Sequence, residues 1–384
     1  MPPANSVFAA CGTTIFETMS RLAQACGAIN LGQGFPEGLE PQPLIERLAR
    51  AAQEGPHQYP SMMGIPALRE AVAAHERFYW RTGADAAEVM VTSGATEALA
   101  ACLFGLIEPG DEVIVFQPLY DSYLPIIRRA GGVARPVRLA PPDWRLDRDA
   151  LAAAFGPRTR LVVLNSPTNP CGRVWSPDDL AFLAGLVDRH DCAVICDEVY
   201  EHLTYDGTAH VPLMSLPGMR GRCAKIGSAG KIFSLTGWKV GWVVAEAALL
   251  APIAKAHQYL TFTTQPALQA AVAWGLDECR DYLEALPATL AARRDRLAAG
   301  LRRAGLAPLP CSGSYFLSAD FRPVGFRGPD GDFCRHITEA AGVAAIPVSA
   351  FFDGGGPTHL ARFCFAKTDA AIDEAMARLQ RHFG

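Results

Sequence analysis

The sequence of 384 residues predicts an α/β fold with a mostly parallel central sheet, helices on both faces of that sheet, and a smaller α+β domain. Half of the residues are apolar, which is enough for a sizeable core. From about residue 88, short β-branched runs alternate with amphipathic segments of helix length. These runs are apolar at nearly every position, as in strands that are buried on both faces of a sheet.

Four of the apolar runs are predicted strands of the large domain, to which we assign residues 40–280. These strands are 88–92, 112–116, 160–164 and 192–196. The next segment, 282–304, has apolar positions at helical spacing and is followed by Gly305, which predicts a helix that connects two bodies.

The smaller domain is predicted to combine residues 1–39 with residues 281–384. Its C-terminal part contains further element signals beyond the connecting helix. These are a strand at 314–317, a helix near 331–340, a strand at 359–365 and a C-terminal helix.

Charge and cysteine usage exclude several classes of partner. The net charge is −4 and the 35 basic residues form no stripe, so we expect neither nucleic acid nor an anionic membrane surface as a partner. The N-terminus lacks a signal pattern and the apolar runs are too short to span a bilayer, which predicts a cytoplasmic protein. Eleven cysteines without a C-x-x-C pair indicate reduced core thiols, and we expect no metal.

Polar residues after the predicted strands are the first candidates for a site, because ligands bind at the carboxyl ends of strands in open parallel sheets. Residues 92–97 (TSGATE) form a turn before a helix, which suits an anion cradle or a simple helix cap. Residues 165–172 (NSPTNPCG) also fit a purely structural loop. Asp197 follows a very apolar strand, where a carboxylate needs either a cationic partner or a role as a helix cap.

Two basic side chains stand in apolar surroundings. Lys231 closes a small-residue turn, where a lysine can lose its charge and become a nucleophilic amine, although a snorkelling surface lysine is the alternative. Arg362 lies among apolar residues, where a carboxylate ligand or an internal salt bridge would satisfy it. Together, an anion cradle, an amine, a carboxylate and a carboxylate-binding arginine match what pyridoxal 5′-phosphate needs to act on an amino acid.

In their order along the chain, these residues resemble the class I and II aminotransferases of fold type I, which use pyridoxal phosphate. The matching motifs are 169–172 (NPCG), 197–200 (DEVY), 228–231 (SAGK) and 236–242 (TGWKVGW). Within this family, the chain is most similar to the branch of methionine aminotransferase, kynurenine aminotransferase and glutamine transaminase K. The stretches that carry this similarity are 31–36 (LGQGFP), 58–60 (QYP) with Gly64, and 362–367 (RFCFAK).

The resemblance implies three catalytic residues. Lys231 is expected to hold the cofactor as a Schiff base and then to move the proton between Cα and C4′. Asp197 is expected to keep the pyridine nitrogen protonated. Tyr200 is expected to contact the phenolic oxygen of the ring, together with Asn169.

The same resemblance implies the remaining contacts. The phosphate is expected to bind the backbone of Ala95 and Thr96 together with Ser228 and Lys239. Tyr59 would reach this phosphate from a second subunit, which implies a homodimer.

Three more contacts follow from the resemblance. Tyr120 is expected to stack on the cofactor ring. Arg362 is expected to bind the α-carboxylate of the substrate, and Gly34 and Asn169 are expected to contact the substrate as well.

Two departures from the wider family bear on the substrate. Lys239 stands where dicarboxylate-specific members have arginine, and no motif places a second arginine for a distal carboxylate. We therefore expect transamination of a neutral, medium to large L-amino acid (methionine, glutamine, an aromatic residue or kynurenine), with a 2-oxo acid as acceptor. A C–S β-lyase that acts on cysteine S-conjugates or cystathionine, and a non-catalytic regulatory module, are the alternatives.

Overall fold

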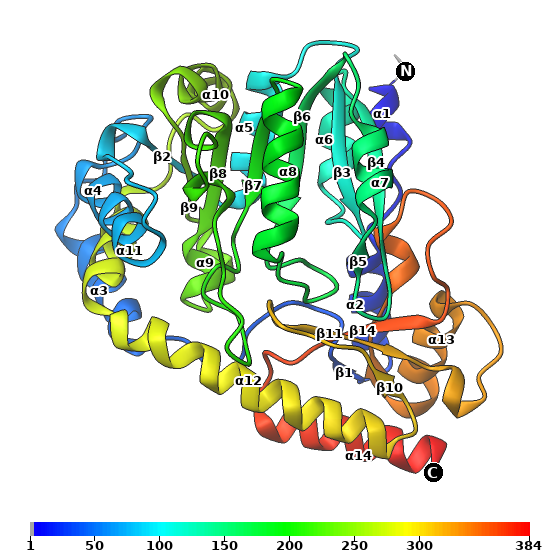
Figure 1. The fold of residues 1–384 in the computed structure, drawn as a ribbon. Coiled ribbons are helices and arrows are strands. Elements are labelled where there is room, and N and C mark those ends of the chain that lie inside the picture. The colour runs from blue at the N-terminus through cyan, green and yellow to red at the C-terminus, as the bar shows by residue number, and fades with distance from the viewer. Residues whose placement is uncertain (1–3) are drawn as a thin grey trace.

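The computed structural model describes residues 4–384, and an eight-stranded sheet forms the centre of its larger body (Figure 1). In spatial order the strands are β2 (Val89–Thr92), β9 (Gly241–Val244), β8 (Cys223–Ser228), β7 (Ala193–Asp197), β6 (Thr159–Asn165), β3 (Glu112–Gln117), β4 (Val133–Ala140) and β5 (Arg145–Leu146). Strands β9 and β5 run antiparallel to their neighbours, and the other neighbouring pairs are parallel. The prediction of a mostly parallel sheet is confirmed.

Both faces of this sheet are covered, as the apolar runs predicted. Along β3, Val113 and Val115 pack into one core, whereas Ile114 and Phe116 pack into the other. The first core includes α5 (Ala95–Leu106), α6 (Tyr123–Arg129) and α10 (Ala247–Leu260). The second includes α3 (Gln42–Glu54), α4 (Pro66–His75), α7 (Arg148–Ala154), α8 (Pro177–Arg189) and α11 (Pro266–Glu278). Because successive strand residues enter opposite cores, these strands need apolar side chains at every position.

The predicted strands of the large sheet correspond to β2, β3, β6 and β7, and each observed end lies within one residue of the prediction. The expected connecting helix is α12 (Arg280–Arg303), which packs lengthwise against the C-terminal helix α14 (Asp369–Phe383) (Figure 1).

The smaller body contains a four-stranded antiparallel sheet. Its spatial order is β10 (Ala307–Pro308), β11 (Phe316–Asp320), β14 (Leu360–Cys364) and β13 (Ile346–Pro347). The N-terminal segment contains α1 (Ser6–Ala9), α2 (Ile15–Ala25) and β1 (Ile29–Asn30), and β1 pairs in parallel with β12 (Val343–Ala344). The N-terminal segment thus lies beside the C-terminal unit. The domain boundaries at 39/40 and 280/281 stay a prediction.

Two elements of the smaller body differ from the prediction. The strand expected at 314–317 begins at Phe316, because Ser314 has a positive φ of 60° that a strand does not accommodate. The helix expected near 331–340 is α13 (Asp330–His336), which continues as a single π-helical turn over Ile337–Ala341. Gly342 ends this turn in a left-handed conformation.

Between residues 4 and 384, no helix has both the length and the apolar character that crossing a membrane requires. All eleven cysteines are free thiols in this same range, and all except Cys11 and Cys26 are buried.

Candidate active site

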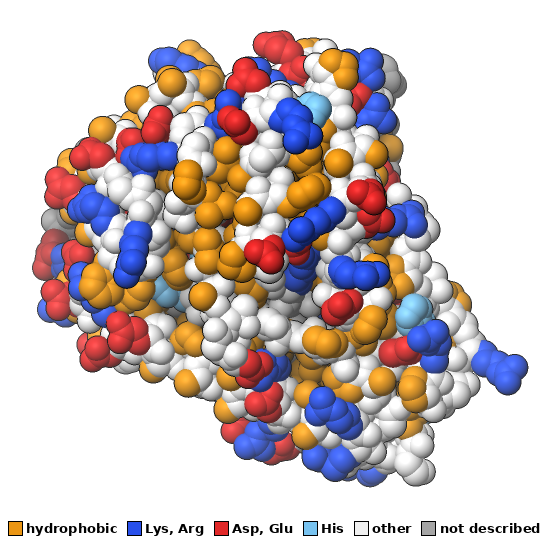
Figure 2. Space-filling model, viewed as in Figure 1, with side chains coloured by type: hydrophobic (Ala, Val, Ile, Leu, Met, Phe, Trp, Pro, Cys, Tyr) orange, Lys and Arg blue, Asp and Glu red, His pale blue; other side chains and the backbone are white. Residues whose placement is uncertain are grey.

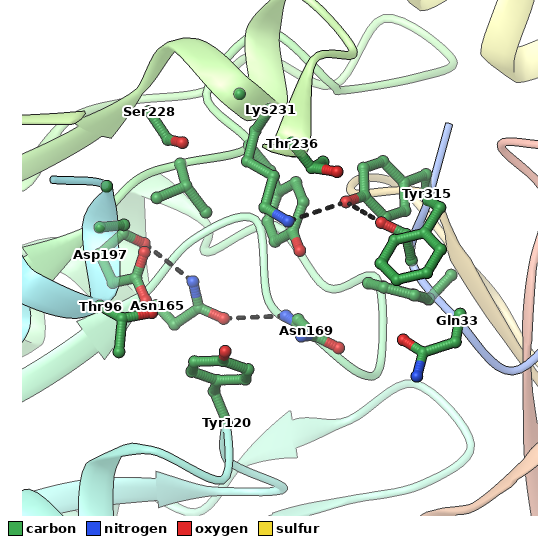
Figure 3. A pocket seen from close by; sticks show the side chains of 18 of the residues that line it. Gln33, Thr96, Tyr120, Asn165, Asn169, Asp197, Ser228, Lys231, Thr236 and Tyr315 are labelled. Atoms are coloured by element: carbon green, nitrogen blue, oxygen red, sulfur yellow. Dashed lines mark hydrogen bonds between the residues drawn. The ribbon is translucent and has the colours of Figure 1, made fainter. Parts of the chain in front are cut away.

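One pocket brings together every predicted site residue except Tyr59. It lies where the carboxyl ends of β7 and β8 and the beginning of α5 meet the smaller body. The predicted residues that line it are Gly34, Ala95, Thr96, Tyr120, Asn169, Asp197, Tyr200, Ser228, Lys231, Lys239 and Arg362. Figure 3 shows several of these side chains converging on one space.

Lys231 projects into this pocket from the short helix α9 (Ala229–Ile232), which directly follows β8. Its Nζ donates a hydrogen bond of 3.2 Å to the hydroxyl of Tyr315, which in turn donates to the Gly34 carbonyl at 3.0 Å. Burial lowers the pKa of Lys231 to about 8, although the charge of Asp197 opposes this shift. A substantial fraction of the amine is therefore neutral and nucleophilic near physiological pH.

Asp197 is the last residue of β7 and is buried beneath the pocket. The Tyr123 hydroxyl donates to its Oδ2 at 2.5 Å, whereas Oδ1 has no hydrogen-bond partner in the described part of the chain. Burial raises the pKa of Asp197 to about 6, while Tyr123 and Lys231 favour the ionised form. A buried carboxylate oxygen without a partner is suited to accept a hydrogen bond from a cationic ligand.

The residues of the predicted anion cradle stand at the beginning of α5. The first backbone N–H groups of a helix have no partner within that helix, and those of Ala95 and Thr96 stand at this end. Lys239 lies beside them in a left-handed conformation. A Cβ atom at Gly94 would stand 3.1 Å from the Lys239 Nζ, so the glycine leaves the space that brings this ammonium to the helix end.

Two tyrosines and an asparagine surround the space between the amine and the carboxylate. Figure 3 shows Tyr120 across the pocket from Lys231. Burial raises the pKa of Tyr200 far above its usual range, so its hydroxyl remains a hydrogen-bond donor. Asn169 is held in place because its backbone N–H donates to the Asn165 Oδ1 at 2.8 Å.

Arg362 enters the pocket from the middle of β14, so it does not occupy a strand end as the other candidates do. It is fully buried, and it donates to the Asn169 Oδ1 at 2.9 Å and to the Gly32 carbonyl at 2.5 Å. Its guanidinium lies 3.9 Å from the ring centroid of Phe316. Within residues 4–384 it forms no salt bridge, and its Nε has no partner. The alternative of an internal salt bridge is therefore not what the structure shows.

Gly34 lines the pocket, whereas Tyr59 lies outside it. A Cβ atom at Gly34 would approach the Phe316 Cζ to 2.7 Å, so a larger residue would displace the ring that stacks on Arg362. Tyr59 does not line the pocket. Its side chain is 82% exposed and contacts Phe262 edge to face.

Sequence reasoning missed several residues that shape the pocket. Tyr123 binds Asp197, Tyr315 binds Lys231, and Asn165 donates to the Asp197 carbonyl at 2.8 Å. Asn165 lies in the loop segment 165–172 that the sequence had singled out, and Tyr123 lies three residues after Tyr120. No local signal marked Tyr315, because its role depends on the packing of the smaller body against the larger one.

The arrangement fits the cofactor that the motifs imply. Pyridoxal 5′-phosphate needs an amine, a carboxylate near its ring nitrogen and a site for its phosphate. The partly neutral Lys231, the unpartnered oxygen of Asp197 and the cradle at Ala95 provide these three groups.

Comparisons with known proteins agree with this geometry. The family model of "Aminotransferase class I and II" matches residues 27–379. A probable N-succinyldiaminopimelate aminotransferase of Mycobacterium tuberculosis is 45% identical over 379 residues, which cover 96% of this chain and 95% of that protein. The methionine aminotransferase of Escherichia coli is 44% identical over 372 residues, which cover 96% of each chain.

Solved structures lead to the same family. The N-succinyldiaminopimelate aminotransferase structure from Mycobacterium tuberculosis superimposes with a TM-score of 0.96 at 44% identity, over 99% of this chain and 100% of that one. An Escherichia coli structure described as having a methionine aminotransferase function gives a TM-score of 0.95 at 43% identity, with the same coverage.

Proposed function

Because the chain belongs to the class I and II aminotransferases, which depend on pyridoxal 5′-phosphate, we propose that it transfers the amino group of a neutral, medium to large L-amino acid to a 2-oxo acid. Methionine, glutamine, aromatic amino acids and kynurenine are the proposed donors. The observation that carries the proposal is Arg362, a fully buried guanidinium without a carboxylate partner among the described residues. Such a group is suited to bind the carboxylate of an amino acid.

The charges of the pocket support a neutral substrate side chain. Its basic residues are Lys231, Lys239 and Arg362, and the proposed roles at the cofactor and at the α-carboxylate use all three. The lining near Arg362 is otherwise neutral, and it consists of Phe16, Gln33, Phe35, Tyr315 and Phe316. A second carboxylate on the substrate would therefore find no additional cation in this part of the pocket, and burying it without a partner is costly.

The proposed residue roles are those that the family motifs imply, and the position of each residue in the pocket supports them. When bound, the cofactor supplies an electron sink for the carbanion at the substrate Cα. Lys231 would hold the cofactor and move the proton at that carbon, since its amine is partly neutral. Asp197 would bind the ring nitrogen through the oxygen that Tyr123 leaves unpartnered.

The remaining proposed roles concern the ring and the phosphate. Tyr120 would cover one face of the ring, and Tyr200 with Asn169 would bind its phenolic oxygen. The backbone of Ala95 and Thr96 would bind the phosphate, together with the side chains of Ser228 and Lys239.

We also propose that the chain acts as a cytoplasmic homodimer. Tyr59 does not line the pocket of its own chain, and its exposed ring contacts exposed Phe262. Exposed Tyr259 and Leu260 shortly precede Phe262, and we call these four residues the apolar surface group. A second copy that covers this group would bring Tyr59 to the partner's phosphate site.

The substrate is tested with the purified holoenzyme and a panel of amino donors. Methionine, glutamine, phenylalanine and kynurenine are compared with aspartate, glutamate and N-succinyldiaminopimelate, each with pyruvate, 2-oxoglutarate or 2-oxo-4-methylthiobutyrate as acceptor. We expect the best neutral donor to exceed every acidic donor in kcat/KM by at least about tenfold, because an unpaired buried carboxylate is penalised. An acidic donor that equals or exceeds the neutral ones would overturn the proposal.

The β-lyase alternative is tested with the same holoenzyme. The aminotransferase relatives of this chain offer no support for it. Cystathionine is supplied without any acceptor, and pyruvate and ammonia are measured. We expect neither product at a rate that approaches transamination. The Lys231→Ala variant serves as the inactive control.

A further inference from the structure

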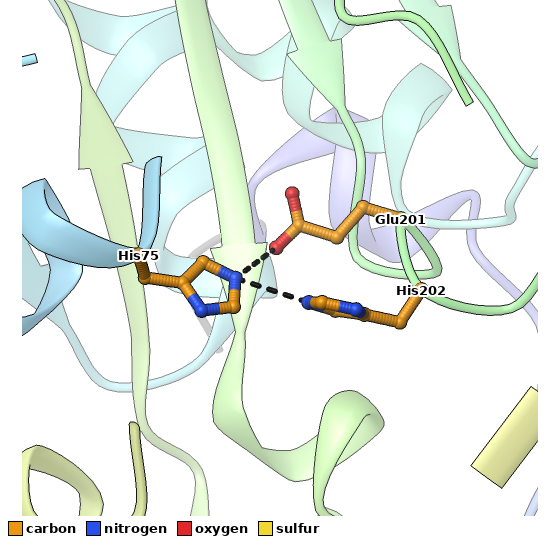
Figure 4. A group of neighbouring side chains, drawn as sticks. All are labelled: His75, Glu201 and His202. Carbon is orange, nitrogen blue, oxygen red and sulfur yellow. Dashed lines mark hydrogen bonds and ion pairs between the residues drawn. The ribbon is translucent and has the colours of Figure 1, made fainter. Parts of the chain in front are cut away.

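The turn that carries Asp197 and Tyr200 has a second, buried side. Asp197 and Tyr200 line the pocket, whereas Glu198, Glu201 and His202 of the same turn point into a buried cluster. Glu198 is 0% exposed and Glu201 is 1% exposed. Figure 4 shows Glu201 and His202 meeting His75, which belongs to α4.

Lys225 lies at the centre of this cluster and is itself fully buried. Its Nζ donates to carboxylate oxygens of both Glu76 and Glu201, and it lies 3.9 Å from the Glu198 Oε2. Lys225 precedes Ser228 by three positions in β8, so the two side chains leave opposite faces of that strand. One strand therefore presents Ser228 to the pocket and Lys225 to the cluster.

Histidines complete the contacts of the two glutamates in the turn. His210 Nε2 lies 2.9 Å from the Glu198 Oε2, and His75 Nε2 lies 3.4 Å from the Glu201 Oε1. His75 Nε2 also lies 3.0 Å from the His202 Nε2. These residues are of types that ligate metals, but the Lys225 ammonium already supplies the cation at Glu201.

The cluster restrains the turn because its carboxylates are buried around a single ammonium. Three carboxylates share Lys225 out of contact with water, and moving Glu201 away from it would separate a buried ion pair, which is costly. The backbone adds one further restraint, since the Glu201 N–H donates to the Glu198 carbonyl at 2.9 Å. A displacement of Glu201 would therefore move Tyr200, its immediate neighbour.

We propose that Glu201, bound to Lys225, is a positioning residue for transamination, which holds Tyr200 and Asp197 at the cofactor from the opposite side of their turn. The inference rests on the proposed roles of these two pocket residues. It predicts that the ion pair between Glu201 and Lys225 influences the cofactor, although neither of the two residues lines the pocket.

Glu76 offers a matched control for Glu201. It binds the same Nζ and is equally buried, but it stands at the end of α4 and not in the turn. A purely structural cluster would respond alike to the loss of either carboxylate.

The experiment compares Glu201→Gln and Glu76→Gln with the wild-type holoenzyme. Three quantities are measured: the melting temperature, the pH midpoint of the absorbance change of the bound cofactor, and kcat with a neutral amino donor. We expect both variants to melt at lower temperature. We expect Glu201→Gln alone to lower kcat, by about tenfold or more, because small misplacements of catalytic groups are costly.

The absorbance midpoint separates positioning from stability. In Glu201→Gln we expect the absorbance midpoint to move to higher pH. A displaced Tyr200 would no longer donate to the phenolic oxygen of the cofactor ring, and this hydrogen bond favours the deprotonated form of the bound cofactor. In Glu76→Gln we expect the wild-type midpoint. Equal midpoints and equal kcat in the two variants would overturn the proposal, whether both match the wild type or both depart from it. A wild-type enzyme without transaminase activity would instead refute the proposed function.

Discussion

The hydroxyl of Tyr123 stands 2.5 Å from Oδ2 of Asp197, to which it donates a hydrogen bond. This contact holds a buried carboxylate whose second oxygen, Oδ1, has no partner in the described part of the chain. Tyr123 begins α6 and Asp197 ends β7, so the pair also joins a helix on one face of the sheet to the strand end that carries the carboxylate.

Removing this hydrogen bond should weaken cofactor binding. Tyr123→Phe leaves the aromatic packing in place but deprives the Asp197 carboxylate of its donor. A hydrogen bond to a charged group contributes about 1.5–3 kcal/mol, so we expect the Kd for pyridoxal 5′-phosphate to rise by roughly tenfold or more. An absorbance titration of the apoenzyme measures it. Tyr282→Phe, which removes a partly buried hydroxyl that donates to the Leu39 carbonyl at 2.8 Å and lies 2.9 Å from the Ser234 Oγ, should leave the Kd unchanged.

The lowered pKa of Lys231 should set the pH dependence of cofactor attachment. Only the neutral amine attacks the cofactor aldehyde, and burial places its pKa at about 8 in place of the usual 10.5. The attachment rate of the apoenzyme should therefore rise with pH and level off above about 8. Stopped-flow absorbance measures this profile.

The charge of Asp197 gives this profile a second test. Because that charge raises the pKa of Lys231, Asp197→Asn should shift the midpoint of the attachment profile to lower pH. A profile that continues to rise beyond pH 10 in the wild type would contradict the burial of the amine.

Replacing the buried arginine should affect the substrate more than the cofactor. Arg362→Lys keeps the positive charge but loses the fork that binds Asn169 and Gly32. We expect KM for the amino donor to increase by about tenfold to a hundredfold, with an unchanged cofactor spectrum.

A second buried arginine provides the control for this substitution. Arg294→Lys alters a residue paired with Asp206 away from the pocket, and it should leave KM unchanged. An equal change of KM in both variants would show that the effect of Arg362 is a general loss of packing.

Charges introduced into the exposed apolar group should dissociate the proposed dimer. Tyr259 is 84% exposed and Leu260 lies beside it. Because a desolvated charge without a partner opposes association, Tyr259→Asp with Leu260→Asp should give a monomer that binds pyridoxal 5′-phosphate more weakly than the wild type. Analytical ultracentrifugation and the absorbance titration measure the two effects. A variant that remains dimeric with normal affinity would place the interface elsewhere.

The sequence alone determined the class of fold, because strands buried on both faces are apolar at every position and are therefore visible without tertiary information. It also singled out Asp197 and Lys231 as charged residues in apolar surroundings, although a helix cap and a surface lysine stayed open as alternatives. The motifs around these residues then indicated the family, which the comparisons confirmed.

Only the tertiary structure decided which side chains meet. Tyr315 comes from the smaller body, and nothing in its local sequence shows that it lies beside Lys231. The resemblance placed Arg362 and Asn169 at the same substrate, but only the structure shows that Arg362 donates directly to Asn169. The buried cluster behind the turn at 197–202 could not be predicted from local sequence either. Its members Glu76 and Lys225 are separated by 149 residues and meet only when α4 packs near β8. Local sequence specifies whether a residue is buried and charged, whereas long-range packing specifies which partner satisfies that charge.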